Sequence, residues 1–303
     1  MKSKNMKVFY PYYYQNFRCI AEKCTHSCCV GWEISVDDET LENYTRHNPE
    51  YCDYIDMESR VISLCDDSRC PFLTGEGLCK IISEFGDGYV SRICREHPRF
   101  YHKVCGRVEG GIGMVCEEAA RIILTHDDYT DFLVVEKNDT EWADESEFDG
   151  IGHREDIYKI LGKKDLSFHS QLDEIRGKYS LPKNIHTSEE WNEIFSTLEY
   201  LDEDHFSLFK VGNEDSRPDI SEYLRRFFAY LIFRHLSVAK DVDNLRARLG
   251  FCLLLVSVLE NYTAEREIDA FMVADFARII SEEIEYSNDN TDALIFEFES
   301  ELI

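Results

Sequence analysis

The distribution of cysteines constrains this chain more than any other feature of its sequence. Eleven of its twelve cysteines lie within the first 116 residues. Four of them form the run Cys19-x4-Cys24-x3-Cys28-Cys29, in which the last two thiols are adjacent. Successive side chains leave the backbone in different directions. Both thiols of such a pair can therefore form bonds only in a polydentate centre or in two separate bonds. The N-terminal third is therefore predicted to be a metal-binding module.

The redox compartment decides between metal and disulfides. The basic start of the chain is not followed by an apolar signal segment, so we expect a reducing, cytoplasmic location. Dense cysteines in that compartment usually bind metal, whereas disulfides are the alternative for an exported protein. Soft thiolates select zinc or iron–sulfur clusters over magnesium or calcium. One compact hook followed by single cysteines at 70, 79 and 94 suits one cluster with ligands from several loops at least as well as zinc.

The charge of the chain is strongly negative and unevenly placed. The formal net charge is −27, and residues 131–303 carry 18 Lys and Arg against 39 Asp and Glu. Such a surface repels phosphate backbones, so nucleic acid is not an expected partner, and it favours encounter with a lysine-rich surface. The alternative is that the charge only maintains solubility. The longest apolar run, Phe251 to Leu259, is too short to span a membrane, so no membrane partner is expected.

The sequence predicts a mainly α-helical fold with an irregular, cysteine-rich metal-binding module at residues 1–130 and a helical body at 131–303. Residues 19–113 are rich in turn formers, and no alternating series long enough for a doubly wound sheet is present. An acidic segment at residues 136–150 marks the boundary. Helices are predicted at Asp37–Arg46, Glu117–His126, Ser188–Leu198, Ile220–Val238, Asn244–Tyr262 and Ile268–Glu285, the last with Phe271 on its buried side.

Five segments carry a family signature. They are Tyr10 to Trp32, Cys70-Pro-Phe-Leu-Thr-Gly-Glu-Gly-Leu-Cys79, Cys94-Arg-Glu-His-Pro-Arg99, Met114-Val-Cys116-Glu-Glu-Ala-Ala-Arg121 and Glu283-Ile-Glu285-Tyr-Ser287-Asn-Asp-Asn290. Together they resemble the flagellin lysine N-methylase family of bacteria. The cysteine part is also similar to a broader group of zinc- or iron-chelating proteins, and the C-terminal segment favours the methylase.

The resemblance implies transfer of a methyl group from S-adenosylmethionine to lysines of flagellin, by an enzyme with an iron–sulfur centre of the 4Fe-4S type. Zinc is the alternative metal, and residues 131–303 are the candidate region for substrate and donor. A four-iron cluster takes about four thiolates, so either two centres exist or several cysteines are structural. A non-enzymatic metal-binding or cluster-handling protein is the rival function. The candidate metal ligands are Cys19, Cys24, Cys28, Cys29, Cys70, Cys79, Cys94 and Cys116.

The predicted catalytic residues are Glu285 and Tyr286. A lysine amine has a reference pKa of ~10.4, so a site must remove its proton before the amine can attack a sulfonium methyl group. Glu285 and Tyr286 are candidates for orienting the ammonium and relaying that proton, and the alternative is that Glu285 only caps a helix end. Position 31 is glycine, so Cys24-x3-Cys28 does not continue into the three-cysteine pattern of a radical mechanism, and polar displacement is favoured.

Three further residues are candidates for cofactor binding. Arg95 and Arg99 are expected to bind the donor carboxylate or to offset cluster charge, with surface ion pairing as the alternative. Asn290 completes the C-terminal segment of the resemblance. The glycine-rich segment Glu109-Gly-Gly-Ile-Gly113 is a weaker candidate because it lacks the spacing of a nucleotide-binding loop, and an ordinary turn is the favoured interpretation.

Overall fold

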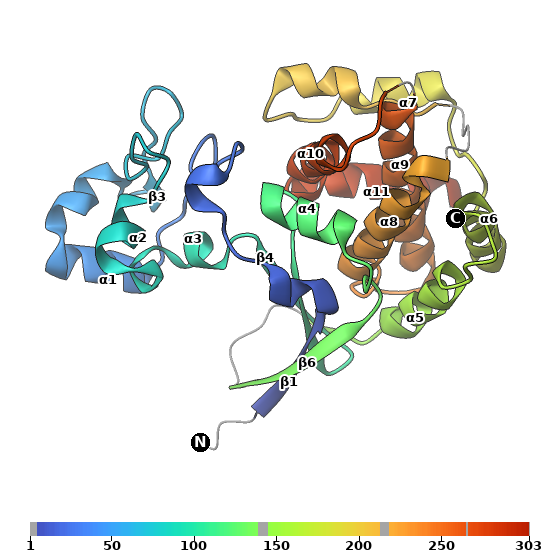
Figure 1. Ribbon diagram of the computed structural model, residues 1–303, viewed down its shortest axis with the longest axis horizontal. Helices are drawn as coiled ribbons and strands as arrows, with labels where there is room; N and C mark the ends of the chain where they lie inside the picture. Colours follow the sequence, from blue (N-terminus) through green and yellow to red (C-terminus); the bar gives the residue numbers. More distant parts are fainter. Residues whose placement is uncertain (1–4, 139–144, 213–217, 265, 303) are drawn as a thin grey trace. The chain divides into compact units, whose positions relative to one another are not determined.

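The computed structural model describes residues 5–138, 145–212, 218–264 and 266–302 (Figure 1). The chain is mainly α-helical, as its sequence predicts. The helices are α1 (Asp38–His47), α2 (Lys80–Phe85), α3 (Arg92–Glu96), α4 (Glu117–Thr125), α5 (Gly150–Leu161), α6 (Phe168–Tyr179), α7 (Ser188–Phe195), α8 (Ser221–His235), α9 (Val242–Thr263), α10 (Ala270–Ile280) and α11 (Asn288–Leu302). The strands are β1 (Asn5–Pro11), β2 (Ile55–Asp56), β3 (Val61–Ile62), β4 (Arg99–Val104), β5 (Arg107–Ile112), β6 (Phe132–Asn138) and β7 (Glu145–Ser146).

Backbone contacts divide the chain into two compact units. The cysteine unit comprises Arg18–Phe100 and Cys116–Glu118, and the helical unit comprises Met1–Phe17, Tyr101–Val115 and Ala119–Ile303. The contacts therefore divide the chain elsewhere than at residue 130. The reason is that one sheet contains both early and late strands. In it β1 pairs with β6 and β4 pairs with β7, which connects the early strands to the later part of the chain.

The cysteine unit has little regular structure and a small apolar core. Its longest helix is α1, which begins at the predicted place because the Asp37 side chain accepts a hydrogen bond from the backbone N–H of Thr40. The same carboxylate accepts from the backbone N–H of Arg92, 2.7 Å away, so it also holds the start of α3. The core of this unit is built from Ile34, Val36, Tyr44, Tyr51, Ile55, Ile62, Cys70, Phe72, Ile81 and Val90.

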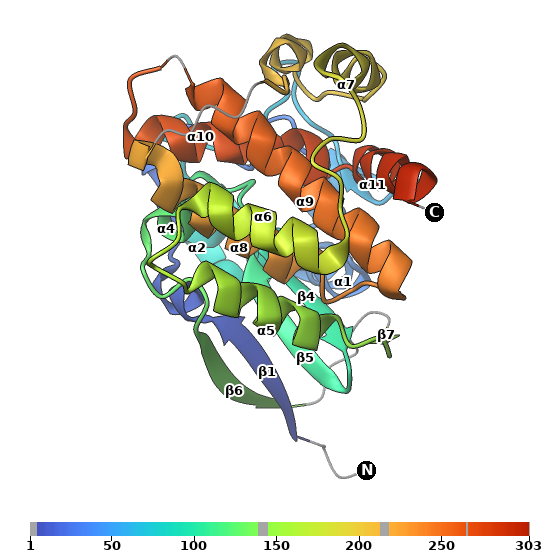
Figure 2. The same ribbon diagram turned by 90° about the vertical axis from the view of Figure 1, so that its right-hand side faces the viewer.

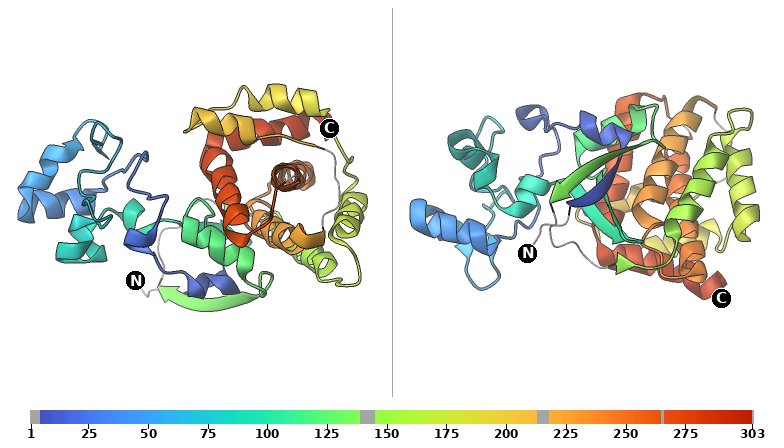
Figure 3. Two further views of the ribbon diagram at one scale, coloured as in Figure 1. Left: turned by 45° about the horizontal axis from the view of Figure 1, so that its top comes forward. Right: turned by 90° about the horizontal axis from the view of Figure 1, so that it is seen from below.

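The helical unit contains a five-stranded sheet that the sequence did not predict. The strand order is β6-β1-β5-β4-β7, with β1 parallel to β5 and antiparallel to β6. Figure 3 shows β6, β1 and β5 side by side in its right-hand view. The two residues between β4 and β5, Cys105 and Gly106, both have positive φ (48° and 72°), which is the backbone that a two-residue hairpin turn requires.

The glycine-rich segment lies in this sheet. Gly110 belongs to β5, and a Cβ there would lie 2.5 Å from the ring of Tyr10 and 2.9 Å from that of Tyr101. A Cβ at Gly113 would lie 2.4 Å from the hydroxyl oxygen of Tyr286. These glycines therefore let aromatic side chains approach the backbone. Residues 109–112 thus belong to the buried strand β5 and Gly113 directly follows it, where an ordinary turn was expected.

Apolar helices make up the core of the helical unit. The 22-residue α9 packs against α8, α10 and α11, and α5 packs against α6 and α8 (Figure 2). Residues all around α8 and α9 are buried, which confirms the prediction that both are central helices. The prediction for Phe271 is wrong. Phe271 is 59% exposed because α10 directs Val273, Ala274 and Phe276 inward, which leaves residue 271 on the outer side.

The acidic boundary segment is only partly described. Residues 139–144 lie outside the described residues, and Glu145–Ser146 form the short strand β7. The predicted start at Ser188 is confirmed, since α7 begins there with a capping box between Thr187 and Glu190.

Candidate metal centre and buried polar network

The eight predicted metal ligands all belong to the cysteine unit. Seven lie between Arg18 and Phe100, and Cys116 comes from the short return segment Cys116–Glu118. All twelve cysteines of the chain are described, and all are free thiols. Cys105 and Cys252 belong instead to the helical unit, where Cys252 is a buried core residue of α9 as predicted.

Four of these thiols meet at the apolar core of the cysteine unit. Cys70 is a core residue, and Cys29, Cys79 and Cys94 pack against the same core. The backbone N–H of Cys70 donates to the carbonyl of Cys29 over 2.8 Å, which fixes their two segments together. Cys79 directly precedes α2, and its backbone forms an isolated antiparallel β-bridge with that of Leu73. Cys94 lies in α3. We call Cys29, Cys70, Cys79 and Cys94 the core quartet.

The thiols of the core quartet influence one another's ionisation. Burial raises the pKa of Cys70 to about 12 and that of Cys94 to about 11. Charge on the Cys29 and Cys79 thiols adds to the rise for both residues. Cys29 differs, because a hydrogen bond from the Cys28 thiol lowers its pKa. The quartet thus offers four neighbouring soft ligands in a mostly buried setting.

The carboxylate of Glu117 binds the loop that follows Cys24. Glu117 accepts hydrogen bonds from the backbone N–H of Thr25 (2.7 Å), the hydroxyl of Thr25 (2.7 Å) and the backbone N–H of His26 (3.1 Å). The thiol of Cys24 lies 3.7 Å from the same carboxylate. Because Glu117 directly follows Cys116, these bonds bring the Cys24 loop to Cys116.

The Cys28 thiol hydrogen-bonds to its neighbour Cys29, so Cys28 connects the core quartet to the remaining predicted ligands. A hydrogen bond to Cys29 and burial raise the pKa of Cys28, and charge on Cys116 and Cys19 raises it further. Burial raises the pKa of Cys24 to about 11, with a contribution from Cys116.

Metal binding by these cysteines stays a prediction, because among the described residues no three cysteine sulfurs lie within 4.8 Å of one another. Thiolates are the ligands that zinc and iron–sulfur clusters prefer, and the core quartet supplies the usual number of four. The raised pKa values mean that most of these thiols keep their protons without a metal, so binding would release protons.

The two arginines predicted to bind a cofactor follow Cys94 closely in the sequence. Arg95 is exposed on α3, and Arg99 is half-buried with Nη1 3.5 Å from the carbonyl of His97; their predicted roles stay predictions.

The predicted catalytic residue Glu285 lies in the helical unit, within a buried polar network. Its carboxylate accepts from the hydroxyl of Tyr230 (3.0 Å) and contacts Nε2 of His235 (2.7 Å) and Nε of Arg234 (3.2 Å). The Glu285 side chain has no exposed surface. It ends a single π-helical turn, Ser281–Glu285, a feature common at functional sites.

Sequence reasoning missed the three partners on α8. They are Tyr230, Arg234 and His235, which interrupt the otherwise apolar segment Phe227–His235. Polar side chains within such a buried segment need partners, and that is the signal that would have found them. Burial raises the pKa of Glu285, but Arg234 and His235 outweigh it and bring the value to about 2. The carboxylate is therefore ionised near neutrality.

Tyr286 connects this network to the less buried part of the unit. It is partly exposed, and the guanidinium of Arg234 lies 4.8 Å from its ring centroid. The Tyr286 side chain also hydrogen-bonds with Arg234. Arg234 thus lies between an ionised carboxylate and a partly exposed tyrosine, whose hydroxyl oxygen packs against Gly113.

Asn290 lies beside the same π-helical turn. Its side-chain N–H groups donate to the carbonyls of Glu199 (2.6 Å) and Glu283 (2.7 Å), and its carbonyl accepts from the backbone N–H of Glu199. Every polar atom of the buried amide is therefore used within the fold. Its predicted role in cofactor binding stays a prediction.

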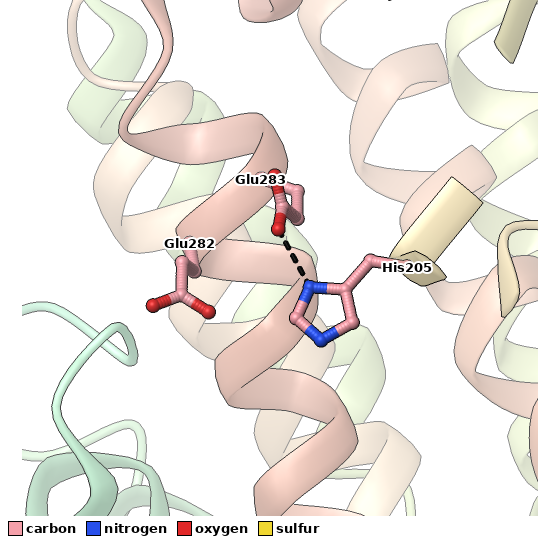
Figure 4. A group of neighbouring side chains, drawn as sticks. All are labelled: His205, Glu282 and Glu283. Atoms are coloured by element: carbon pink, nitrogen blue, oxygen red, sulfur yellow. Dashed lines mark hydrogen bonds and ion pairs between the residues drawn. The ribbon is translucent and has the colours of Figure 1, made fainter. Parts of the chain in front are cut away.

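Two acidic residues of the π-helical turn meet a histidine. Figure 4 shows the His205 ring facing the Glu283 carboxylate, 2.6 Å from Nδ1, with Glu282 beside it. Among the described residues, this is the one group of three whose candidate ligand atoms all lie within 4.8 Å of one another. Glu283 also accepts from the backbone N–H of Leu201, and Glu282 pairs with Arg278. The group is thus a clamp that holds the loop at 201–208 to the turn.

The chain is similar to curated bacterial proteins over part of its length. It is 24% identical over 137 residues to the flagellar biosynthetic protein FliU of Salmonella muenchen, a match that covers 41% of the chain and 81% of FliU. It is equally similar to the lysine-N-methylases of Salmonella choleraesuis and Salmonella typhimurium. The match spans 34% of the length of each methylase.

These similarities confirm the resemblance that the sequence motifs indicate. No family model matches the chain, and no solved structure matches it. None of the helices in the described ranges combines the length and the apolar character that a bilayer crossing requires.

Proposed function

We propose that this protein is an S-adenosylmethionine-dependent lysine N-methyltransferase that acts on flagellin and holds an iron–sulfur centre in its cysteine unit. The observation that carries the proposal is the similarity to two lysine-N-methylases over 137 residues. The name of the third relative, a flagellar biosynthetic protein, supports flagellin as the substrate. The excess of acidic residues at 131–303 also suits a lysine-bearing partner.

The chemistry requires a group that deprotonates the substrate lysine. In our proposal Tyr286 orients the lysine ammonium and its phenolate form accepts one ammonium proton. The freed amine then attacks the sulfonium methyl group of S-adenosylmethionine, the S–CH3 bond breaks, and S-adenosylhomocysteine leaves. A guanidinium next to a phenol favours the phenolate, so Arg234 suits Tyr286 to this role. Tyr286 and Arg234 are both partly exposed, and we assign Tyr286 the contact with the substrate because only its hydroxyl can accept a proton.

Glu285 takes a different part in this proposal. With a pKa of about 2 it is too weak a base to accept a proton from lysine near neutral pH. Its charge instead holds Arg234 and His235 in place, since it contacts both side chains. Glu285 therefore acts as a positioning residue for Arg234, and through it for Tyr286.

The metal centre has a structural role in the proposal. Bound to thiols from separate loops, a cluster supplies the cross-links that a segment with little regular structure lacks. The metal-binding rival needs only these cysteines, so the test must measure methyl transfer itself.

Methyl transfer is tested with anaerobically purified protein, S-adenosylmethionine labelled in its methyl group, and flagellin. We expect label on flagellin lysines, and roughly 100-fold less with Tyr286→Phe, since loss of a general base typically costs at least that much. The matched control is Tyr262→Phe, which removes a hydroxyl from a tyrosine stacked on Phe276 elsewhere in the helical unit. No label with the wild-type protein would favour the non-enzymatic rival, and an unchanged rate for Tyr286→Phe would remove Tyr286 from the mechanism.

A further inference from the structure

The backbone that leaves strand β5 lies directly against Tyr286 and Arg234. A Cβ at Gly113 would overlap the hydroxyl oxygen of Tyr286, and it would lie 2.9 Å from Nη1 of Arg234. Non-bonded carbon atoms pack best at about 3.5–4.0 Å from their neighbours. The phenol oxygen and the guanidinium therefore occupy the space that any residue larger than glycine would fill.

This position does not need glycine for its backbone conformation. Among the described residues, the glycines with positive φ are Gly31, Gly77, Gly86 and Gly106. Gly113 is not one of them, so alanine can adopt the same backbone conformation. What matters at Gly113 is the missing side chain.

Hydrogen bonds of the next residue hold this backbone in place. The N–H of Met114 donates to the hydroxyl oxygen of Tyr230 over 3.2 Å. Nη1 of Arg234 donates to the same oxygen over 3.1 Å. The backbone at Gly113 is thus linked to the buried polar network, and it cannot withdraw from Tyr286 without breaking the bond of Met114.

We propose that Gly113 is a positioning residue, which gives the Tyr286 hydroxyl its place beside the Arg234 guanidinium. The proposal rests on the proposed function, in which Tyr286 accepts the lysine proton, and it names the residue that places that hydroxyl. The guanidinium carbon of Arg234 lies 4.8 Å from the centroid of the Tyr286 ring. A nearby guanidinium favours the phenolate, so Gly113 also influences how readily Tyr286 ionises.

An alanine at this position should displace side chains and leave the fold intact. The atoms nearest to its Cβ belong to the far ends of the Tyr286 and Arg234 side chains. Such ends move by rotation about side-chain bonds, whereas the backbone here is fixed. Gly113→Ala should therefore fold with the Tyr286 hydroxyl moved away from Arg234.

The first test measures the ionisation of Tyr286 in the full chain without substrate. Carbon-13 NMR of protein labelled at tyrosine Cζ gives a Tyr286 signal, identified by its absence from Tyr286→Phe. In Gly113→Ala this signal should titrate about one pH unit higher than in the wild type, because the phenol has lost its cationic neighbour. Gly177→Ala on α6 is the matched control, since a Cβ there would meet no atom within 4 Å, and it should leave the titration unchanged. An unchanged titration in Gly113→Ala would overturn the proposal.

Thermal unfolding tests the contact itself. Gly113→Ala should lower the melting temperature by about 2–6 °C, as overpacking of a filled site does. In the Tyr286→Phe background the same alanine should cost less, because the oxygen that it would overlap is absent. Equal losses in the two backgrounds would show that the Tyr286 hydroxyl does not pack against Gly113.

Methyl transfer is measured separately, so that the contact and the reaction can fail independently. Gly113→Ala should lower kcat at pH 7 about 10-fold with the KM for flagellin unchanged, and the deficit should shrink as the pH rises. A wild-type rate at every pH would remove Gly113 from the mechanism. If the wild-type protein transfers no methyl group, the proposed function fails, while the titration and the melting temperatures still decide whether Gly113 positions Tyr286.

Discussion

Arg154 on α5 donates two hydrogen bonds to Glu109 on β5, from Nη1 to Oε2 over 2.6 Å and from Nη2 to Oε1 over 2.7 Å. Both side chains are completely buried, and Arg107 donates a third bond to Glu109 over 2.6 Å. A buried ion pair with this geometry is compensated only while both partners are present. The pair therefore fixes the sheet to the helices of this unit.

Replacing Arg154 by methionine should lower the free energy of unfolding by about 3–5 kcal/mol, because it leaves the Glu109 charge buried with one guanidinium fewer. The measurement is urea denaturation followed by circular dichroism. Lys159→Met is the control: its partner Asp156 is also on the surface of α5, so the loss should stay below about 0.5 kcal/mol. Equal losses for the two variants would contradict this account.

Glu285→Gln should destabilise the protein in a pH-dependent way. The pKa of Glu285 in the fold is about 2, below its usual 4.5, so the ionised carboxylate stabilises the fold above pH 4.5 and this contribution disappears as the pH falls toward 2. The wild-type advantage over the variant should be roughly 3 kcal/mol at pH 7 and should shrink between pH 4.5 and 2. Urea titrations of both proteins across this range measure it. An advantage that does not vary with pH would show that Glu285 is not held ionised.

The sequence predicted the helices well because their signals are local. Capping residues and apolar spacing at Asp37, Ser188 and Asn244 depend only on nearby positions, and the corresponding helices begin within two residues of them. The sheet was missed because β1 and β5 are separated by about a hundred residues. In addition, β5 contains two adjacent glycines, which interrupt the alternation of apolar and polar residues that predicts a strand. Pairing of such segments depends on tertiary packing.

The candidate site was predictable only in part, for the same reason. The cysteine run predicts the candidate metal ligands, but which of their loops lie together, as those of Cys70 and Cys29 do, depends on tertiary contacts. Glu285 was singled out by family resemblance, while its partner Arg234 lies 51 positions earlier on another helix. Neither association has a signature in the local sequence.

The clamp at His205 should weaken as the pH rises. The hydrogen bond to Glu283 raises the pKa of His205 above its usual 6.5. The charged bond therefore contributes in full below pH 6.5 and is lost as the pH rises through the folded-state pKa. The stability difference between wild type and His205→Gln should fall between pH 6 and pH 9, because the other histidines are common to both proteins. A difference that grows over this range would contradict the assignment.

Glu117 should govern how firmly the predicted ligands near the Cys24 loop hold their metal. Its carboxylate accepts three bonds from Thr25 and His26, so Glu117→Gln weakens the support of the Cys24 loop without removing a thiol. Loss of such a supporting group typically costs 10–100-fold in metal affinity. We expect the variant to lose its iron to a chelator about ten times faster than the wild-type protein. Glu22→Gln, an exposed change in the same unit, is the control. An unchanged rate of iron loss would show that Glu117 does not support the metal site.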